Sequence, residues 1–241
     1  MQSKIPSIQF STRPIYLQLR DALAQRIAIG EWKPGAAIPN ETELAREFGV
    51  SPGTMRKALS LMEGEHLITR RQGRGTFIND QASEELAGRF CNIRGADGQP
   101  ILGRVQLGEI TKAAASEVEC LRLQLRSKDP VWRFRRVRLH EDRAFMSEEV
   151  VLPAELFPQL DTGNAGRIVL LAQQHGLLLG PAEERISIGS ATPYNAEALH
   201  LTQGAPVIVL DRVVHTIEGR PVEWRVGQCY LAANYYLAHL S

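Results

Sequence analysis

The hydrophobic positions of residues 14–62 recur at the three-to-four-residue spacing of amphipathic helices. Between Pro14 and Ile29 this spacing is kept by Ile15, Leu19, Ala22, Leu23 and Ile27. Pro14 suits a first helical position, and Gly30 suits a helix stop. Two shorter stretches, 41–48 and 52–62, have the same character. The pattern therefore predicts three helices, of which the last two are short.

The two short helices have capping residues in front of them and a tight turn between them. Asn40 and Ser51 each offer a side-chain oxygen to the free amides of a first helical turn. Gly49 closes the earlier helix, and only Val50 separates it from Ser51. Two short helices joined in this way form a helix-turn-helix.

After these helices the pattern changes to that of short strands. Residues 67–71 and 76–78 predict two strands, and the segment Gln72-Gly73-Arg74-Gly75 predicts a tight turn between them. Glycines on either side allow Arg74 to approach another backbone or enter a narrow groove. Either element alone is common, since two packed core helices often show the same spacing. Three helices and a basic hairpin within 80 residues together favour a winged helix-turn-helix.

A polar stretch, residues 79–85, separates this region from a second one that contains an internal repeat. We place a linker at residues 81–89, between domains at residues 1–80 and 90–241. In the second domain a helix and a strand over residues 117–139 recur over residues 196–215. Each strand leads through a polar turn into a further strand with a glutamate, Glu148 or Glu223. The second domain is therefore expected to contain two copies of a helix and a hairpin.

Arginines alternate with apolar residues on the long strands of this repeat. Arg136 and Arg138 share one face, and Arg212 and Val214 share the equivalent face of the other copy. A guanidinium on an apolar face needs a carboxylate, a backbone carbonyl or a bound anion. Equivalent positions favour an internal ion pair for Arg136 and Arg212, whereas Arg138 has no basic counterpart and is the better candidate for a ligand contact. Alternatively, this face is partly open to solvent and none of the charges has a special role.

The composition agrees with a folded, two-domain protein and limits its chemistry. Of 241 residues, 44% are hydrophobic and 23% are charged, as in ordinary globular proteins. Residues 1–80 hold eleven Lys or Arg and eight Asp or Glu, against seventeen and nineteen in the rest. Three distant cysteines show no disulfide or zinc pattern. Neither a signal peptide nor a membrane-spanning stretch is recognised, so we expect a cytoplasmic protein with no membrane partner.

The first 80 residues resemble the GntR family of bacterial transcription regulators. The matching segments are Pro14-Ile15-Tyr16-Leu17-Gln18-Leu19, Gly30-Glu31-Trp32-Lys33-Pro34-Gly35, Ile38-Pro39-Asn40-Glu41, Leu44-Ala45, Gly49-Val50-Ser51, Thr54-Met55-Arg56-Lys57-Ala58-Leu59 and Gln72-Gly73-Arg74-Gly75-Thr76-Phe77. The resemblance implies DNA binding, with the third helix in the major groove. The residues expected at DNA are Asn40, Ser51, Thr54, Arg56, Lys57, Gly73, Arg74, Gly75 and Thr76. Of Arg70 and Arg71, which point to opposite faces of a strand, at most one is expected to touch DNA.

The second domain is similar to UTRA, the effector-sensing domain of the HutC-type branch of that family, whose fold resembles chorismate lyase. Matching segments include Arg136-Val137-Arg138-Leu139, Pro206-Val207 and Gly219-Arg220-Pro221-Val222-Glu223. The resemblance implies an α+β protein, with a winged helix-turn-helix followed by an α/β domain with an antiparallel sheet. It also implies an effector pocket lined by Arg136, Arg138, Glu148, Glu223 and Tyr230. Ala165-Gly166-Arg167-Ile168-Val169 stands where members that bind sugar phosphates offer Ser and Tyr, which favours a carboxylate-bearing effector.

These features predict a sequence-specific DNA-binding transcription regulator, expected to be a repressor, whose DNA affinity is controlled by a small-molecule effector. One helix-turn-helix reads only a few base pairs, so we expect a homodimer on a palindromic operator. No cofactor or metal is predicted, because the six histidines lack metal-ligand spacing and no catalytic or nucleotide-loop motif occurs. Two alternatives stay open: a lyase-like enzyme in the second domain, and a constitutive DNA-binding dimer without an effector.

Overall fold

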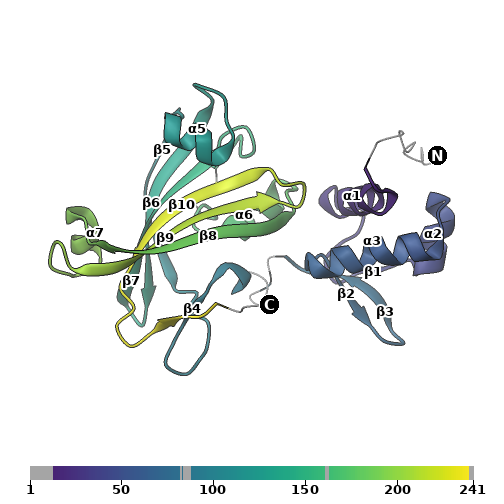
Figure 1. Cartoon of the computed structure of the whole chain (residues 1–241), viewed down its shortest axis with the longest axis horizontal. Helices are drawn as coiled ribbons and strands as arrows, with labels where there is room; N and C mark the ends of the chain where they lie inside the picture. Colours follow the sequence, from purple (N-terminus) through teal and green to yellow (C-terminus); the bar gives the residue numbers. More distant parts are fainter. Residues whose placement is uncertain (1–12, 82, 84–87, 161–162, 239–241) are drawn as a thin grey trace. The chain divides into compact units, whose positions relative to one another are not determined.

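The computed structural model describes residues 13–81, 83, 88–160 and 163–238. These residues form two compact units (Figure 1), one mainly before Leu86 and one mainly after Ala87. Most of the predicted linker, residues 81–89, lies outside the described residues. Its last part is described, because Gly88–Phe90 form a single turn of 3-10 helix, η1.

The first unit consists of three helices and a small antiparallel sheet. Its elements are α1 (Ile15–Ala28), β1 (Ala37–Ile38), α2 (Glu41–Phe48), α3 (Pro52–Gly64), β2 (Ile68–Arg71) and β3 (Gly75–Ile78). Helix α3 packs against both α1 and α2, and its buried side chains are Met55, Ala58, Leu59 and Met62. The predicted winged helix-turn-helix is confirmed. Strand β1, which pairs with β3 and completes the sheet order β1-β3-β2, was not predicted, since two residues are too few to show alternation.

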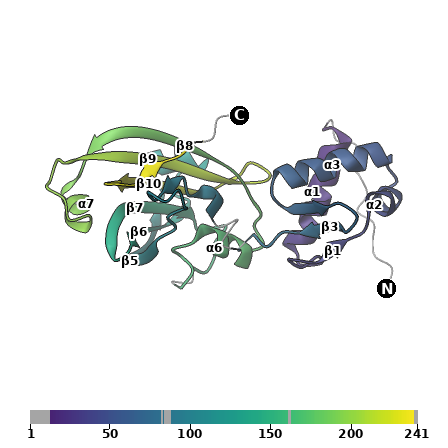
Figure 2. The same ribbon diagram turned by 90° about the horizontal axis from the view of Figure 1, so that it is seen from below.

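The second unit is built around one six-stranded antiparallel sheet. Its further elements are β4 (Ile93–Arg94), β5 (Arg104–Ala114), α5 (Glu117–Leu123), β6 (Pro130–His140), β7 (Arg143–Pro153), α6 (Ile168–Gln174), β8 (Leu179–Ser190), α7 (Pro193–Ala198), β9 (Pro206–Thr216), β10 (Pro221–Cys229) and β11 (Tyr235–Tyr236). The strand order of the sheet is β5-β6-β7-β10-β9-β8, and Figure 2 shows β8, β9 and β10 running side by side. The predicted α+β fold class is confirmed.

The strand order is symmetric about its centre, as an internal repeat requires. The units β5-α5-β6-β7 and β8-α7-β9-β10 follow one another along the chain, and β7 pairs with β10 where they meet. The helix and hairpin of each copy were predicted from the sequence, but β5 and β8 were not. These are the two edge strands, and their side chains are exposed on much of both faces, so no clear alternation marks them.

The register of the hairpins shows which residues of the two copies correspond. Arg136 lies opposite Glu148, and its repeat equivalent Arg212 lies opposite Arg225. The counterpart of Glu148 is therefore Arg225, whereas Glu223 lies opposite Val214. The two glutamates are therefore not equivalent in register, because irregularities in each hairpin shift the register between the turn and the strand.

Alternation along the strands divides the side chains between two faces of the sheet. On one face Leu123 of α5 packs with Val131 and Val151. On the other, Ile93 and Ile101 pack with a hydrophobic cluster that includes Leu210 and Cys229. The short strands β4 and β11, which pair with each other, belong to this second side. Arg136 and Glu148 also project from it, because they alternate with Val131 and Val151.

Candidate functional sites

Both short helices of the first unit begin with the caps that the sequence predicts. The Asn40 side chain accepts a hydrogen bond from the Glu43 amide, and the Glu43 carboxylate accepts one from the Asn40 amide, each at 3.0 Å. The Ser51 hydroxyl accepts from the Thr54 amide at 3.2 Å and lies 2.8 Å from the Thr54 hydroxyl. This reciprocal capping fixes where α2 and α3 begin.

The outer face of α3 carries the basic side chains that were expected at DNA. Arg56 is exposed and donates two hydrogen bonds to Glu41, from Nε at 3.1 Å and from Nη2 at 2.7 Å. This contact raises the pKa of Arg56, so the group is firmly charged. The Lys57 ammonium lies 3.9 Å from the centroid of the Tyr16 ring. Both cations stand on the side of α3 opposite its buried residues.

The hairpin after α3 presents one arginine at its tip. Gly73 and Gly75 have φ angles of 70° and 108°, a region that favours glycine. They place Arg74 between them, exposed, next to the half-buried Thr76. Arg70 instead turns back to α3 and donates to the Arg56 carbonyl at 3.1 Å and to the Ser60 hydroxyl at 3.2 Å, whereas exposed Arg71 stacks on Phe77.

In the second unit the structure brings four of the five expected effector residues together. Arg136 is 2% exposed; its Nε donates to Glu148 at 2.5 Å, its Nη2 lies 3.7 Å from Glu223, and its Nη1 donates to the Gly166 carbonyl at 3.0 Å. Arg138 donates to Glu148 at 2.8 Å and to the Leu102 carbonyl at 3.1 Å. Both arginines therefore have internal partners, with Glu148 shared between them.

Three further charged residues join this group, Arg212, Arg225 and Glu184, and the last two were not predicted from the sequence. The Arg225 guanidinium contacts Glu148 and lies 3.4 Å from Glu184, which also accepts from Arg212 Nε at 2.7 Å. We call the seven residues the buried charge cluster: Arg136, Arg138, Arg212, Arg225, Glu148, Glu184 and Glu223. Alternation from Glu223 along β10 would have found Arg225, whereas Glu184 depends on the register between β8 and β9.

The expected tyrosine does not lie in the cluster. Tyr230 follows the end of β10 and is 45% exposed, and its backbone amide donates to the Phe145 carbonyl at 2.9 Å. The hydroxyl that reaches the cluster belongs to Tyr236, which donates to Glu184 at 2.5 Å and accepts from Asn92 at 2.6 Å. Pairing of β11 with β4 brings Tyr236 there, and this long-range contact leaves no local signal in the sequence.

Glycines make room for the buried charges. A Cβ at Gly227, opposite Glu148 in the sheet, would lie 3.3 Å from Glu148 Cγ. A Cβ at Gly166 would lie 2.9 Å from Val105 Cγ1. In this structure Gly166 therefore offers a carbonyl to Arg136 and has no space for a larger side chain.

Burial controls the electrostatics of the cluster. It lowers the pKa of Arg138 to about 9, with a further contribution from the charge of Arg136. The pKa of Arg225 is lowered well below its usual value by burial and then by the charges of Arg138 and Arg136. Burial also raises the pKa of the Cys229 thiol and of Tyr236 to about 12, so both groups are neutral at pH 7. Arginines are thus crowded together in a place poor in water.

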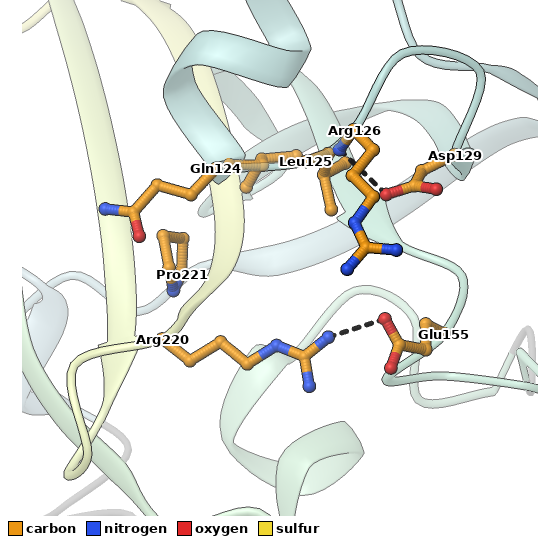
Figure 3. A pocket seen from close by; sticks show the side chains of 8 residues that line it. Gln124, Leu125, Arg126, Asp129, Glu155, Arg220 and Pro221 are labelled. Carbon is orange, nitrogen blue, oxygen red and sulfur yellow. Dashed lines mark hydrogen bonds and ion pairs between the residues drawn. The ribbon is translucent and has the colours of Figure 1, made fainter.

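A separate cavity of about 490 Å³ lies beside the end of α5 (Figure 3). Leu123, which lines it, packs with Val131 and Val151, so the cavity is on the side of the sheet opposite the cluster. Arg220 donates to Glu155 at 2.7 Å across its lower edge, and the Arg126 guanidinium points into it. These three side chains are exposed. None of the expected effector residues lines this cavity.

The described residues show no other obvious chemical centre. No group of three or more His, Cys, Asp or Glu in them is arranged to hold a metal ion. Cys91, Cys120 and Cys229 are free thiols. No helix among these residues is both long and apolar enough to span a bilayer.

Comparison with protein families assigns both parts of the chain. Residues 15–78 match the description "Bacterial regulatory proteins, gntR family", and residues 103–234 match the UTRA domain. The second match alone covers more than half of the chain. It includes all seven residues of the buried charge cluster.

Comparison with individual proteins agrees with these matches. The chain is 26% identical to the mannosyl-D-glycerate transport/metabolism system repressor MngR of Escherichia coli, covering 88% of this chain and 90% of the relative. It is 27% identical to the transcriptional repressor NagR of Bacillus subtilis, with 94% of each covered. Among solved structures, the possible transcriptional regulator YydK of Bacillus subtilis is 18% identical, with a TM-score of 0.56 over 95% of this chain and 100% of that chain. At this identity, the structural likeness supports the fold alone.

Proposed function

The chain belongs to the GntR family of bacterial transcription regulators and carries a UTRA domain, and from this premise we propose how it reads DNA and senses its effector. The protein is a DNA-binding regulator under effector control. We propose that it is a repressor, because MngR and NagR are both named repressors.

The observation that carries the DNA proposal is the outer face of α3. Arg56 and Lys57 project from it, and Thr54 lies at its first turn. A recognition helix enters the major groove with its N-terminal residues leading. In this proposal Arg56 contacts a base edge. To do so, it gives up its hydrogen bonds to Glu41 and forms hydrogen bonds to the DNA.

The caps and the wing fix the position of α3 on the duplex. Helix starts at Asn40 and Ser51 direct backbone amides at phosphate oxygens. The hairpin tip brings Arg74, flanked by Gly73 and Gly75, to the DNA backbone or the minor groove, with Thr76 beside it. These contacts hold the protein in register, whereas Arg56 supplies sequence preference.

The buried charge cluster is the proposed effector site. Arg136, Glu148 and Glu223 form its core, and Arg138 reaches outward, with 22% of its side chain exposed. We propose a small carboxylate-bearing effector, held by Arg138 in a charge-assisted hydrogen bond. The lack of space for a side chain at Gly166 supports an effector that needs no hydroxyl from this position.

The active species is proposed to be a homodimer on a palindromic operator. Strand β8 is an edge of the sheet, and its segment 186–190 carries no charge. Ile186 and Ile188 are 50% and 86% exposed. The opposite edge, β5, is interrupted between Leu107 and Ile110 and carries charged side chains. An exposed, uncharged edge with apolar side chains favours strand pairing with a second chain, so we propose that two copies pair through β8.

The experiment that tests this function is a search for the effector. Purified protein is heated with a library of metabolites, and each compound that raises the Tm is tested for release of a DNA selected by the protein from a random pool. We expect at least one compound to do both. A protein that binds DNA but responds to no compound would instead be a constitutive DNA-binding dimer.

An Arg138→Ala variant tests whether the effector binds at the buried charge cluster. It should fold and bind the same DNA as the wild type, but its affinity for the effector should fall about tenfold to hundredfold. Arg104→Ala, an exposed arginine paired with Asp142, is the matched control. If Arg138→Ala unfolds instead, Arg138 is a structural ion-pair residue and the effector binds elsewhere.

A further inference from the structure

The buried charge cluster contains more positive than negative charge. Four guanidinium groups face three carboxylates, so one positive charge is in excess among the described residues. The neighbouring Tyr236 and Cys229 are neutral at pH 7 and do not offset it. An uncompensated charge in a protein interior is costly, and ordinarily it is paired or bound to a counter-ion.

Arg225 shares each of its carboxylate contacts with other arginines. Its two acidic contacts are both shared: Glu148 already accepts from Arg136 and Arg138, and Glu184 already accepts from Arg212. Its Nε atom is buried and has no hydrogen-bond partner among the described residues. Without Arg225, each remaining arginine would still touch a carboxylate.

The repeat shows that Arg225 is not demanded by the fold. Its counterpart in the first copy, at the same place in the register, is Glu148. The two copies thus carry opposite charges at one structural position. This asymmetry, together with the unpaired Nε, indicates that the charge at Arg225 serves a ligand.

We propose that Arg225 is a ligand-selecting residue of the effector site, and that the site takes an oxyanion group with a single net negative charge. The inference rests on the proposed effector site. The group is a carboxylate or a singly ionised phosphate ester, and either neutralises the excess charge. Arg138 is where the cluster reaches solvent, and Arg138 and Arg225 contact the same carboxylate, Glu148. The oxyanion therefore binds between Arg138 and Arg225.

The test begins with the ligand-free protein and a variant that removes the excess charge. Arg225→Met is apolar, of similar length, and placed beside Met146, whose sulfur already lies 3.4 Å from Arg225 Nη1. Because replacing a surplus buried ion by an apolar side chain often stabilises a protein, the Tm of Arg225→Met should exceed that of wild type by several degrees. Arg225→Lys keeps the charge and should not show this gain. Unfolding is followed by tryptophan fluorescence.

The second part of the test uses simple probes of known charge. Sodium acetate, sodium phosphate and neutral acetamide are titrated into wild type at pH 7, with ionic strength matched by sodium chloride. Acetate should raise the Tm in a saturable way, and acetamide, of the same shape, should not. A larger rise with phosphate than with acetate would identify a phosphoryl group as the source of the oxyanion. Arg225→Met should lose the response to both anions.

Two results would overturn the inference. If Arg225→Met has a lower Tm than wild type or fails to fold, Arg225 is a structural ion-pair residue. If acetamide stabilises as well as acetate, or if neither anion acts, the site does not select a negative charge. Both outcomes leave the proposed regulator intact, because that proposal fails only if no compound releases the DNA.

Discussion

The two units use arginine in opposite ways. In the first unit Arg56 and Arg74 lie at the surface, where water screens their charge and removal leaves no hole. In the second unit Arg136 and Arg225 are 2% and 4% exposed, and each depends on carboxylates that other arginines share. Surface arginines can therefore be changed with little effect on stability. If the cluster is the effector site, as proposed, its arginines couple ligand binding to the stability of the fold.

The largest effect is expected where a buried carboxylate is shared. Glu148→Gln removes the negative charge that Arg136, Arg138 and Arg225 all contact. Loss of one partner of a buried ion pair costs about 3–5 kcal/mol, so the free energy of unfolding should fall by that amount in a denaturant titration. Glu149, the neighbour of Glu148 on the other face, pairs with exposed Arg135. Glu149→Gln should change the free energy of unfolding by less than about 0.5 kcal/mol. Equal effects would remove the contrast between buried and exposed pairs.

A pair of intermediate exposure should show a pH dependence. The Arg133 guanidinium, which donates to both Glu119 oxygens at 2.5 Å, lowers the pKa of Glu119 from 4.5 to about 2. A lowered folded-state pKa gives stability that is complete above about pH 5 and is lost as the pH falls towards 2. Glu119→Gln keeps the helix cap but not the ion pair. Between pH 5 and 2.5 its free energy of unfolding should therefore fall by about 2–3 kcal/mol less than that of wild type. Glu117→Gln, an exposed neighbour, should follow wild type.

On the surface, the expected loss is in DNA binding. Arg56→Ala should weaken binding to the selected DNA about tenfold to hundredfold, with the Tm unchanged, in a gel shift at fixed salt. Arg104→Ala of the second unit serves as control. Wild-type affinity should also fall steeply as salt rises, because phosphate contacts release counter-ions. Full affinity in Arg56→Ala would exclude it as the base contact.

The smallest effect is expected at the edge of the sheet. Ile188→Lys adds a charge to an exposed segment of β8, and it should raise the dimer dissociation constant about tenfold or more without changing the Tm of the monomer. Sedimentation equilibrium measures this constant. Leu121→Lys on α5, where the leucine is 80% exposed, is the control for an apolar residue elsewhere. A wild type that is monomeric at micromolar concentration would contradict the dimer itself.

Local signals explain which parts of the fold the sequence predicts. Helix caps and turn glycines act within a few residues, as at Asn40, Ser51, Gly73 and Gly75. The helices and the wing of the first unit can therefore be predicted from the sequence. In the second unit the strands of the two hairpins are predictable because they are largely buried. Strands β5 and β8 are not, because their side chains are exposed on much of both faces.

The candidate site is only partly predictable for a related reason. Alternation along one strand finds Arg136 and Arg138, but the partner across the sheet depends on register. The irregularities in the hairpins therefore hid the correspondence between Glu148 and Arg225. Tyr236 could not be predicted as part of the cluster, because it is brought there by a strand pairing with residues far away in the chain.

The pairing of β11 with β4 has a consequence for the order of synthesis. Asn92 and Tyr236, whose side chains are hydrogen-bonded, are separated by 144 residues. At about 5–20 residues per second a ribosome needs roughly 7 to 30 seconds to make this interval. During that interval the helix-turn-helix leaves the ribosome, while Glu184 still lacks its tyrosine. A newly made chain therefore acquires the parts for reading DNA before the proposed effector site is finished.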